Sequence, residues 1–113
     1  MAIKRPREQD LTRPILDYLA LAGIYAFRLN SGKVQTSRGT WVQLAPSGAA
    51  DVVGVLEGGR WLCVELKRKS GGKLRPAQAA WLDMMRSKGA LCVVARDVAD
   101  LREALRLEGY AAP

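Results

Sequence analysis

Two carboxylates and a lysine occupy positions at which neighbouring strands would bring them together. Side chains alternate between the two faces of a strand, so Glu65 and Lys67 share one face of the apolar segment 60–67. Asp51 opens the preceding apolar segment, 51–56, and the short Glu-Gly-Gly turn between the two segments is typical of an antiparallel hairpin. The start of one hairpin strand lies beside the end of the other, so we expect Asp51 to approach Glu65 and Lys67.

Such a trio is suited to metal-assisted hydrolysis of a phosphodiester bond. Two neighbouring carboxylates repel each other, and a hard divalent cation such as Mg²⁺ or Mn²⁺ relieves the repulsion by taking their oxygens as ligands. The ammonium of Lys67 would hold or activate a water molecule, or stabilise the charge that develops on the phosphate. Structural hairpins also carry an acid and a Glu-x-Lys triplet, so a purely structural role is the alternative for this pattern taken alone.

The sequence contains no histidine, which narrows the chemistry available. Ser-His and Cys-His nucleophile pairs and metal sites built on two histidines are excluded. The two cysteines, Cys63 and Cys92, both lie in apolar runs, and we interpret them as buried free thiols rather than as a disulfide or a zinc site. Catalysis would therefore depend on carboxylates, lysine and a metal ion.

The composition is that of a globular chain with a strong positive charge. At 113 residues the chain is long enough for one hydrophobic core, and we expect a single domain over 1–113. Its 18 Lys and Arg against 11 Asp and Glu give a net charge of +7, which favours a polyanionic partner, although basic proteins without one also exist. No apolar run is long enough to cross a membrane and the N-terminus does not resemble a signal peptide, so we expect a cytoplasmic protein.

Apolar periodicity predicts an α/β fold in which helices flank a mixed sheet. A first helix is predicted over 8–22, with its start between residues 7 and 11 and with Pro14 either in its first turn or at a kink. The other predicted elements are a strand at 25–30, a polar loop at 31–39, a hairpin partner strand at 40–44, the hairpin at 51–67, a helix from Pro76 to Lys88, a strand at 90–95 and a last helix between Asp97 and Gly109. Their order is α-β-β-β-β-α-β-α.

Side-chain patterns also predict which surfaces are buried. One face of the second helix is marked by four residues at helical spacing: Ala77, Trp81, Met84 and Lys88. Trp61 and Trp81 lie in apolar patterns and are predicted to be core residues. Trp41 lies in a polar strand, where it would either stack on a ligand or pack at a subunit contact.

A cluster of positive charges follows the candidate trio around two glycines: Lys67, Arg68, Lys69, Lys73 and Arg75. A flexible basic lip of this kind would bind phosphates without reading bases, although part of it would serve only solubility. Arg28, Lys33 and Arg38 fit either phosphate contacts or solvated loop charges. Asn30 and Gly32 fit the same loop, where they would also serve simply to shape the turn.

Taken together, motifs in a fixed order resemble the VRR-NUC domain nucleases of the PD-(D/E)XK superfamily. The motifs are an early helical acid (Glu8), an Arg-x-Asn strand end (28–30) followed by Gly32, a Pro-x-Gly-x-x-Asp segment (46–51), Val-Glu-Leu-Lys (64–67), Gly-Lys-Leu-Arg-Pro-Ala-Gln (72–78) and an apolar strand after Lys88 and Gly89. The resemblance runs from Glu8 to about Leu105, and order and spacing make it more specific than any one motif. The chain departs from the family pattern at Ala50, where relatives usually carry serine or proline.

The resemblance implies a restriction-endonuclease-like core and a metal ion with three ligands: Asp51, Glu65 and the backbone carbonyl of Leu66. Lys67 would be the catalytic lysine, and Gln78 would arrange the lysine or the metal-bound water. Glu8 would reach the metal directly or through water. The alternatives are a solvated acid in the first helical turn for Glu8 and a surface position for Gln78.

The chain is similar to small stand-alone members of this family, which act as dimers that cut branched DNA such as four-way (Holliday) junctions. The resemblance therefore implies a homodimeric DNA endonuclease of a bacterial or phage-infected cell. Its expected DNA contacts are Asn30, Lys33, Arg38, Arg68, Lys69, Lys73 and Arg75. Two other classes stay open: a non-catalytic module of the same fold that binds DNA, and a basic structural or protein-interaction domain.

Overall fold

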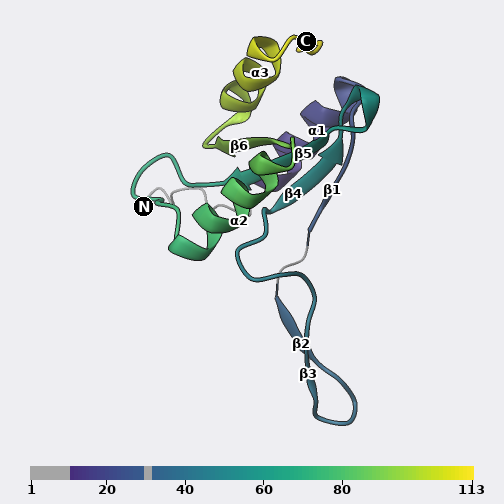
Figure 1. The fold of residues 1–113 in the computed structure, drawn as a ribbon, viewed down its shortest axis with the longest axis vertical. Coiled ribbons are helices and arrows are strands. Elements are labelled where there is room, and N and C mark those ends of the chain that lie inside the picture. The colour runs from purple at the N-terminus through teal and green to yellow at the C-terminus, as the bar shows by residue number, and fades with distance from the viewer. Residues whose placement is uncertain (1–10, 30–31) are drawn as a thin grey trace, which may run out of the picture.

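The structure, a computed structural model, describes residues 11–29 and 32–113. This part of the chain forms three α-helices, a four-stranded mixed sheet and a separate two-stranded hairpin (Figure 1). The helices are α1 (Thr12–Leu21), α2 (Pro76–Ser87) and α3 (Val98–Leu107). The strands are β1 (Tyr25–Arg28), β2 (Lys33–Gln35), β3 (Trp41–Gln43), β4 (Val52–Val55), β5 (Trp61–Leu66) and β6 (Leu91–Ala95).

The four-stranded sheet has the order β1-β4-β5-β6. β4 pairs antiparallel with both β1 and β5, and β6 pairs parallel with β5. The predicted hairpin over 51–67 is confirmed, with Val52 opposite Val64 and the turn at Glu57–Gly59 between the strands. Because β5 and β6 are parallel, the chain must cross from one end of the sheet to the other, and α2 makes this crossover.

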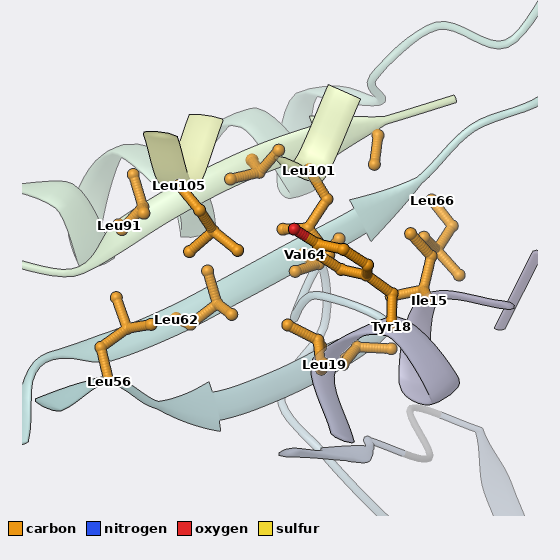
Figure 2. Close-up of a cluster of buried hydrophobic side chains, with 13 residues drawn as sticks. Ile15, Tyr18, Leu19, Leu56, Leu62, Val64, Leu66, Leu91, Leu101 and Leu105 are labelled. Atoms are coloured by element: carbon orange, nitrogen blue, oxygen red, sulfur yellow. The ribbon is translucent and has the colours of Figure 1, made fainter. Parts of the chain in front are cut away.

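α1 and α3 cover one face of the sheet and build the larger hydrophobic core (Figure 2). Ile15 and Leu19 of α1 and Leu101 and Leu105 of α3 are at most 1% exposed. They pack on the side chains that β5 sends to this face: Leu62, Val64 and Leu66. Burying a leucine-sized side chain stabilises a fold by roughly 1.5–3 kcal/mol, so these seven residues fix β5 firmly. Strict alternation along β5 then directs Cys63 and Glu65 to the other face.

α2 covers part of this second face. Its inward side carries Gln78 and Leu82, and Met85 and Trp81 pack beside them. Of the four residues predicted to mark one face of this helix, only Trp81 packs against the core, whereas Met84 is 40% exposed and Ala77 and Lys88 are exposed. The inward face follows the spacing of Gln78, Leu82 and Met85, and the polar glutamine concealed this spacing in the sequence.

The sheet face that α2 leaves uncovered exposes four large apolar side chains: Tyr25, Phe27, Val55 and Trp61. Tyr25 pairs with Val55, and Val55 pairs with Trp61, so these three share one face. The prediction of Trp61 as a core residue is wrong, because this side chain is 53% exposed. The apolar pattern of β5 is therefore only partly explained by the core of the described chain.

Residues 33–43 form a hairpin that projects from the sheet (Figure 1). β2 and β3 pair only with each other, with Val34 opposite Val42. The prediction of residues 31–39 as a loop is wrong, because Lys33–Gln35 is a strand, and the described element order is therefore α-β-β-β-β-β-α-β-α. A polar strand with a single valine shows little apolar alternation, so the pattern did not reveal it.

The helix ends follow the sequence signals. Pro14 lies in the first turn of α1 and does not kink it. The side chain of Asp97 accepts a hydrogen bond from the Asp100 N–H at 2.9 Å, so it caps α3 as predicted, and Gly109 follows the end of α3 with φ +85°. None of the helices in the described ranges has the length and apolar character needed to cross a membrane.

Candidate active site

Asp51 and Glu65 face the same cavity at one end of the sheet. The pairing of Val52 with Val64 places Asp51 opposite Glu65 as the next residue pair of the β4–β5 hairpin. Both side chains line a cavity of about 260 Å³ between the sheet and α2. The other lining residues are Gln43, Ser47, Gly48, Ala49, Arg75, Ala77 and Gln78. The expected meeting of the two carboxylates on one side of the sheet is therefore confirmed.

A buried hydrogen-bonded chain joins Lys67, Gln78 and Glu65. Lys67 Nζ donates to Gln78 Oε1 at 2.9 Å, and Gln78 Nε2 donates to Glu65 Oε1 at 3.0 Å. Lys67 Nζ and Glu65 Oε1 are 3.8 Å apart, which makes them an ion pair as well. The three residues are only 1–7% exposed. One amide thus holds the ammonium and the carboxylate in a fixed relation.

The burial of the charged groups of Glu65 and Lys67 is energetically unfavourable. Moving a charged group out of water is expensive, and a buried ion pair often contributes less stability than apolar side chains of similar volume. Glu65 and Lys67 lie at the end of a strand whose neighbours are apolar, where a packed core would be the simpler solution. Burying these two charges therefore carries a desolvation cost, and the fold would form without it if apolar side chains stood at the same positions.

Gln78 is held in place by the start of α2. Its Oε1 also accepts a hydrogen bond from the backbone N–H of Arg75 at 2.9 Å, three residues earlier. Arg75 is the N-cap residue of α2, and backbone donors at the start of a helix lack helical partners, so the Gln78 side chain caps α2 while it binds Lys67. With 7% exposure, Gln78 is not a surface residue.

Asp51 is fixed by the main chain of β5. Its Oδ2 accepts a hydrogen bond from the Leu66 N–H at 2.8 Å, and its backbone carbonyl accepts one from the Leu29 N–H at 2.8 Å. The Leu66 side chain points into the core of α1 and α3, so its peptide group and not its side chain lies beside the carboxylate. The role of the Leu66 carbonyl as a metal ligand stays a prediction.

Gly48 brings the loop before Asp51 against α2. It has φ +82°, and a Cβ at this position would lie 2.2 Å from the carbonyl oxygen of Ala77. The turn is closed by a hydrogen bond from the Ala49 N–H to the Pro46 carbonyl at 3.1 Å. Only glycine fits such a contact. The Pro-x-Gly-x-x-Asp segment therefore packs against α2 and positions Asp51 in the same cavity as Gln78.

A basic loop, residues 68–75, lies between β5 and α2. Arg68, Lys69 and Lys73 are exposed, and Lys69 Nζ lies 3.9 Å from Asp97 Oδ2. Arg96 anchors this loop: its guanidinium donates to the carbonyl oxygen of Arg68 and, at 2.6 Å, to that of Gly72. Sequence reasoning missed Arg96, because a single arginine after a strand gives no sign of which carbonyls it contacts.

The other predicted DNA contacts are spread over two parts of the molecule. Arg75 lines the cavity itself, whereas Lys33 and Arg38 lie on the projecting hairpin. Gln43, at the base of this hairpin, also lines the cavity, and the sequence did not suggest it. Glu8 and Asn30 lie outside the described residues.

The donor atoms of the cavity suit a magnesium-like ion better than a softer metal. Among residues 11–29 and 32–113, no group of three or more acidic, histidine or cysteine side chains gathers. The ligands that these residues could offer a metal ion in the cavity would therefore be two carboxylates and main-chain oxygen. Mg²⁺ is usually held in this way, by one or two carboxylates with waters and substrate phosphate completing its shell. Asp51 and Glu65 fit this pattern.

The two thiols do not add a nucleophile to the site. Cys63 and Cys92 are free, and they are directly paired on β5 and β6. Burial, reinforced by the neighbouring Cys92, raises the pKa of Cys63 to about 12, and burial also raises the pKa of Cys92. Both thiols are therefore protonated at neutral pH, and chemistry by thiolate is disfavoured.

No protein-family model, curated protein or solved structure matches the chain. The functional assignment therefore rests on the geometry of the site and on the motifs of the sequence.

Proposed function

We propose that the chain is a Mg²⁺- or Mn²⁺-dependent DNA endonuclease with a PD-(D/E)XK-type core. The observation that carries this proposal is the convergence of Asp51 and Glu65 on one cavity, with Glu65 and the buried Lys67 bound to the same amide of Gln78. This combination of two carboxylates, a lysine and an orienting glutamine is the set that the sequence motifs imply.

The proposed roles follow from the contacts. Asp51 and Glu65, together with the Leu66 carbonyl, would hold the metal ion, which when bound supplies Lewis-acid activation of the phosphate and of a water molecule. Lys67 would donate a hydrogen bond to the attacking water or to a phosphate oxygen, because Gln78 and Glu65 hold its Nζ at 2.9 Å and 3.8 Å beside the carboxylate. Gln78 keeps both Lys67 and Glu65 aligned.

DNA binding is supported by the distribution of charge. The net charge of +7 favours a polyanion, and the exposed side chains of Arg68, Lys69 and Lys73 follow directly on the strand that carries the site. Arg75 reaches the cavity itself. These groups would contact phosphates, which position a nucleic acid without reading its sequence.

We further propose that the protein works as a homodimer on branched DNA, because a four-way junction is resolved by two cuts and each needs an active site. The support for a second copy is the apolar row of Tyr25, Phe27, Val55 and Trp61, which is 47–72% exposed on the uncovered sheet face. Light scattering should give a mass near twice the 12.3 kDa of one chain. A mass of one chain at working concentration would contradict the dimer.

The competing assignment is a module of the same fold that grips branched or double-stranded DNA without cutting it. Such a module would have no use for buried charges, and Glu65 and Lys67 are 1% and 3% exposed. Retaining them has a desolvation cost that DNA binding alone does not offset.

Metal-dependent cleavage separates the two assignments. A labelled four-way junction and its separate linear arms are incubated with the protein in EDTA and in Mn²⁺. We expect binding in both conditions and cleavage only with the metal, with the junction preferred. Binding without any cleavage in Mn²⁺ or Mg²⁺ would favour the non-catalytic module. The absence of salt-dependent binding would point to a structural or protein-interaction domain.

A further inference from the structure

The β2–β3 hairpin is connected to the catalytic cavity through one of its faces. Gln43 at the base of β3 lines the cavity that contains Asp51 and Glu65. Residues two apart along a strand share a face, and so do directly paired residues. Trp41 therefore lies on the face of Gln43, together with their partners Gln35 and Lys33.

This face has an unusual composition for an exposed strand. Trp41 is 63% exposed, and its neighbours on the face are polar or positively charged. The opposite face carries Val34 and Val42. A single exposed indole among polar groups does not offer the contiguous apolar area of a protein interface. It does resemble the platforms on which bases stack in proteins that bind single-stranded nucleic acid.

Charge complementarity identifies the occupant of this face. Residues 32–50 include Lys33 and Arg38 and contain no Asp or Glu. These two cations without a neighbouring acid would attract a DNA backbone. The cations and the indole thus favour the same partner.

Hydrogen bonds within its own turn also constrain the hairpin. The Thr36 N–H donates to the Thr40 carbonyl at 2.8 Å, and the Gly39 N–H donates to the Thr36 carbonyl at 2.9 Å. The side-chain amide of Gln35 donates to the Gly39 carbonyl at 3.1 Å. A rigid platform loses less conformational freedom on binding than a mobile one.

We propose that Trp41 stacks on an unpaired DNA base next to the phosphate in the catalytic cavity, so that the hairpin selects DNA with exposed bases over intact duplex. Two residues along a strand span about 7 Å, which matches about two stacked bases. A base at this distance from the cut is accessible at a branch point or in a single-stranded segment, but it is stacked and paired in linear duplex. This inference rests on the proposed function, because the hairpin can select DNA for cleavage only if the neighbouring cavity is the active site.

Equilibrium binding in EDTA tests the inference independently of cleavage. The substrates are a flap DNA with 2-aminopurine in the unpaired segment beside the branch and a blunt linear duplex of the same length. The variants are Trp41→Ala, Trp41→Phe, which keeps an aromatic ring, and Val42→Ala, which removes an exposed apolar side chain from the opposite face of the same strand.

We expect Trp41→Ala to weaken flap binding by roughly 5- to 150-fold and to leave duplex binding nearly unchanged. Trp41→Phe should retain most of the affinity, and Val42→Ala should bind like the wild type. The wild type should quench 2-aminopurine fluorescence more than Trp41→Ala does, because stacking quenches this base.

Three results would overturn the inference. One is equal flap affinity in Trp41→Ala and wild type, and another is an equal loss in Trp41→Ala and Val42→Ala, which would indicate a merely structural hairpin. The third is a change of molecular mass in Trp41→Ala with unchanged affinity, which would assign Trp41 to a contact between copies. If the wild type binds flap DNA through Trp41 but never cleaves it with Mn²⁺, the proposed function fails while the stacking site stands.

Discussion

The side-chain oxygen of Gln78 lies 2.9 Å from Nζ of Lys67 and accepts its hydrogen bond in a buried environment. The same oxygen accepts a hydrogen bond from the Arg75 backbone, while the amide nitrogen binds Glu65. Gln78 therefore positions a charged pair without carrying charge itself, and it ties the pair to the first turn of α2.

Replacing Gln78 with alanine should slow catalysis without weakening DNA binding. Hydrogen bonds to charged groups contribute about 1.5–3 kcal/mol, so we expect kcat to fall by about 10- to 150-fold. Affinity for DNA in EDTA should stay near the wild-type value, because Gln78 is only 7% exposed and contacts the basic loop only at the backbone N–H of Arg75, not at a charged side chain. A parallel loss of affinity and kcat would show that the substitution disrupts the fold and not the alignment. Single-turnover cleavage and equilibrium binding give the two readouts.

Substituting Gly48 by alanine should destabilise the protein more than the same substitution at Gly58. Both glycines have positive φ, +82° and +85°, so both variants carry a backbone strain of about 1–3 kcal/mol. Only at Gly48 would the new Cβ meet another residue, 2.2 Å from the Ala77 carbonyl oxygen, which adds about 1–3 kcal/mol for overpacking. Urea denaturation measures both variants, and equal free energies of unfolding would contradict this contact. The folded fraction of Gly48→Ala should also cleave poorly, because the loop places Asp51.

Replacing Arg96 with alanine should loosen the basic loop. The variant loses the hydrogen bonds to the carbonyl oxygens of Arg68 and Gly72, so amides of residues 68–73 should exchange hydrogen faster. DNA affinity should fall by about fivefold or more beyond the loss in Arg102→Ala, which removes the same charge from an exposed position on α3. Equal losses in the two variants would mean that Arg96 acts only through its charge.

The free energy of unfolding should fall at high pH in a manner that depends on Cys63. The unfolded thiol has a pKa near 9, and burial raises the pKa in the folded state to about 12. Above pH 9 the unfolded state loses its proton first, so the stability contributed by the raised pKa is full below pH 9 and is lost as the pH rises toward 12. Urea denaturation between pH 8 and 11 should show a shallower decline in Cys63→Ala than in wild type. Identical declines would contradict this linkage.

Local signals in the sequence predicted most of the elements that carry the site. The Glu-Gly-Gly turn between two apolar segments predicted the β4–β5 hairpin, and alternation along the second segment predicted that Glu65 faces away from Leu66. From these two features alone, the meeting of Asp51 and Glu65 on one side of the sheet follows, and the structure confirms it. Register within a hairpin is a local property, which is why the sequence predicted it.

Features that lack a local apolar pattern, or that depend on contacts distant in sequence, were not predictable. The β2 strand has no apolar alternation of its own and is defined by its pairing with β3. Trp61 has the pattern of a core residue, but its exposure depends on how far α2 extends over the sheet. Arg96 acquires its role from two carbonyl oxygens more than twenty residues away. Gly48 was visible as part of a motif, but not its contact with Ala77.

Cleavage by two near-isosteric variants tests the proposed site most directly. Asp51→Asn keeps an oxygen for the Leu66 N–H while it removes the negative charge, and Lys67→Met keeps the aliphatic stem while it removes the ammonium. Asp83→Asn is the control, since Asp83 is an exposed acid on α2 paired only with Arg86 among the described residues. Single-turnover cleavage of a labelled four-way junction in Mn²⁺ is measured for each folded protein.

We predict that Asp51→Asn and Lys67→Met each lose at least about a hundredfold in cleavage rate, while Asp83→Asn cleaves like the wild type. Cleavage by either site variant at the wild-type rate would contradict the assignment of these residues to catalysis.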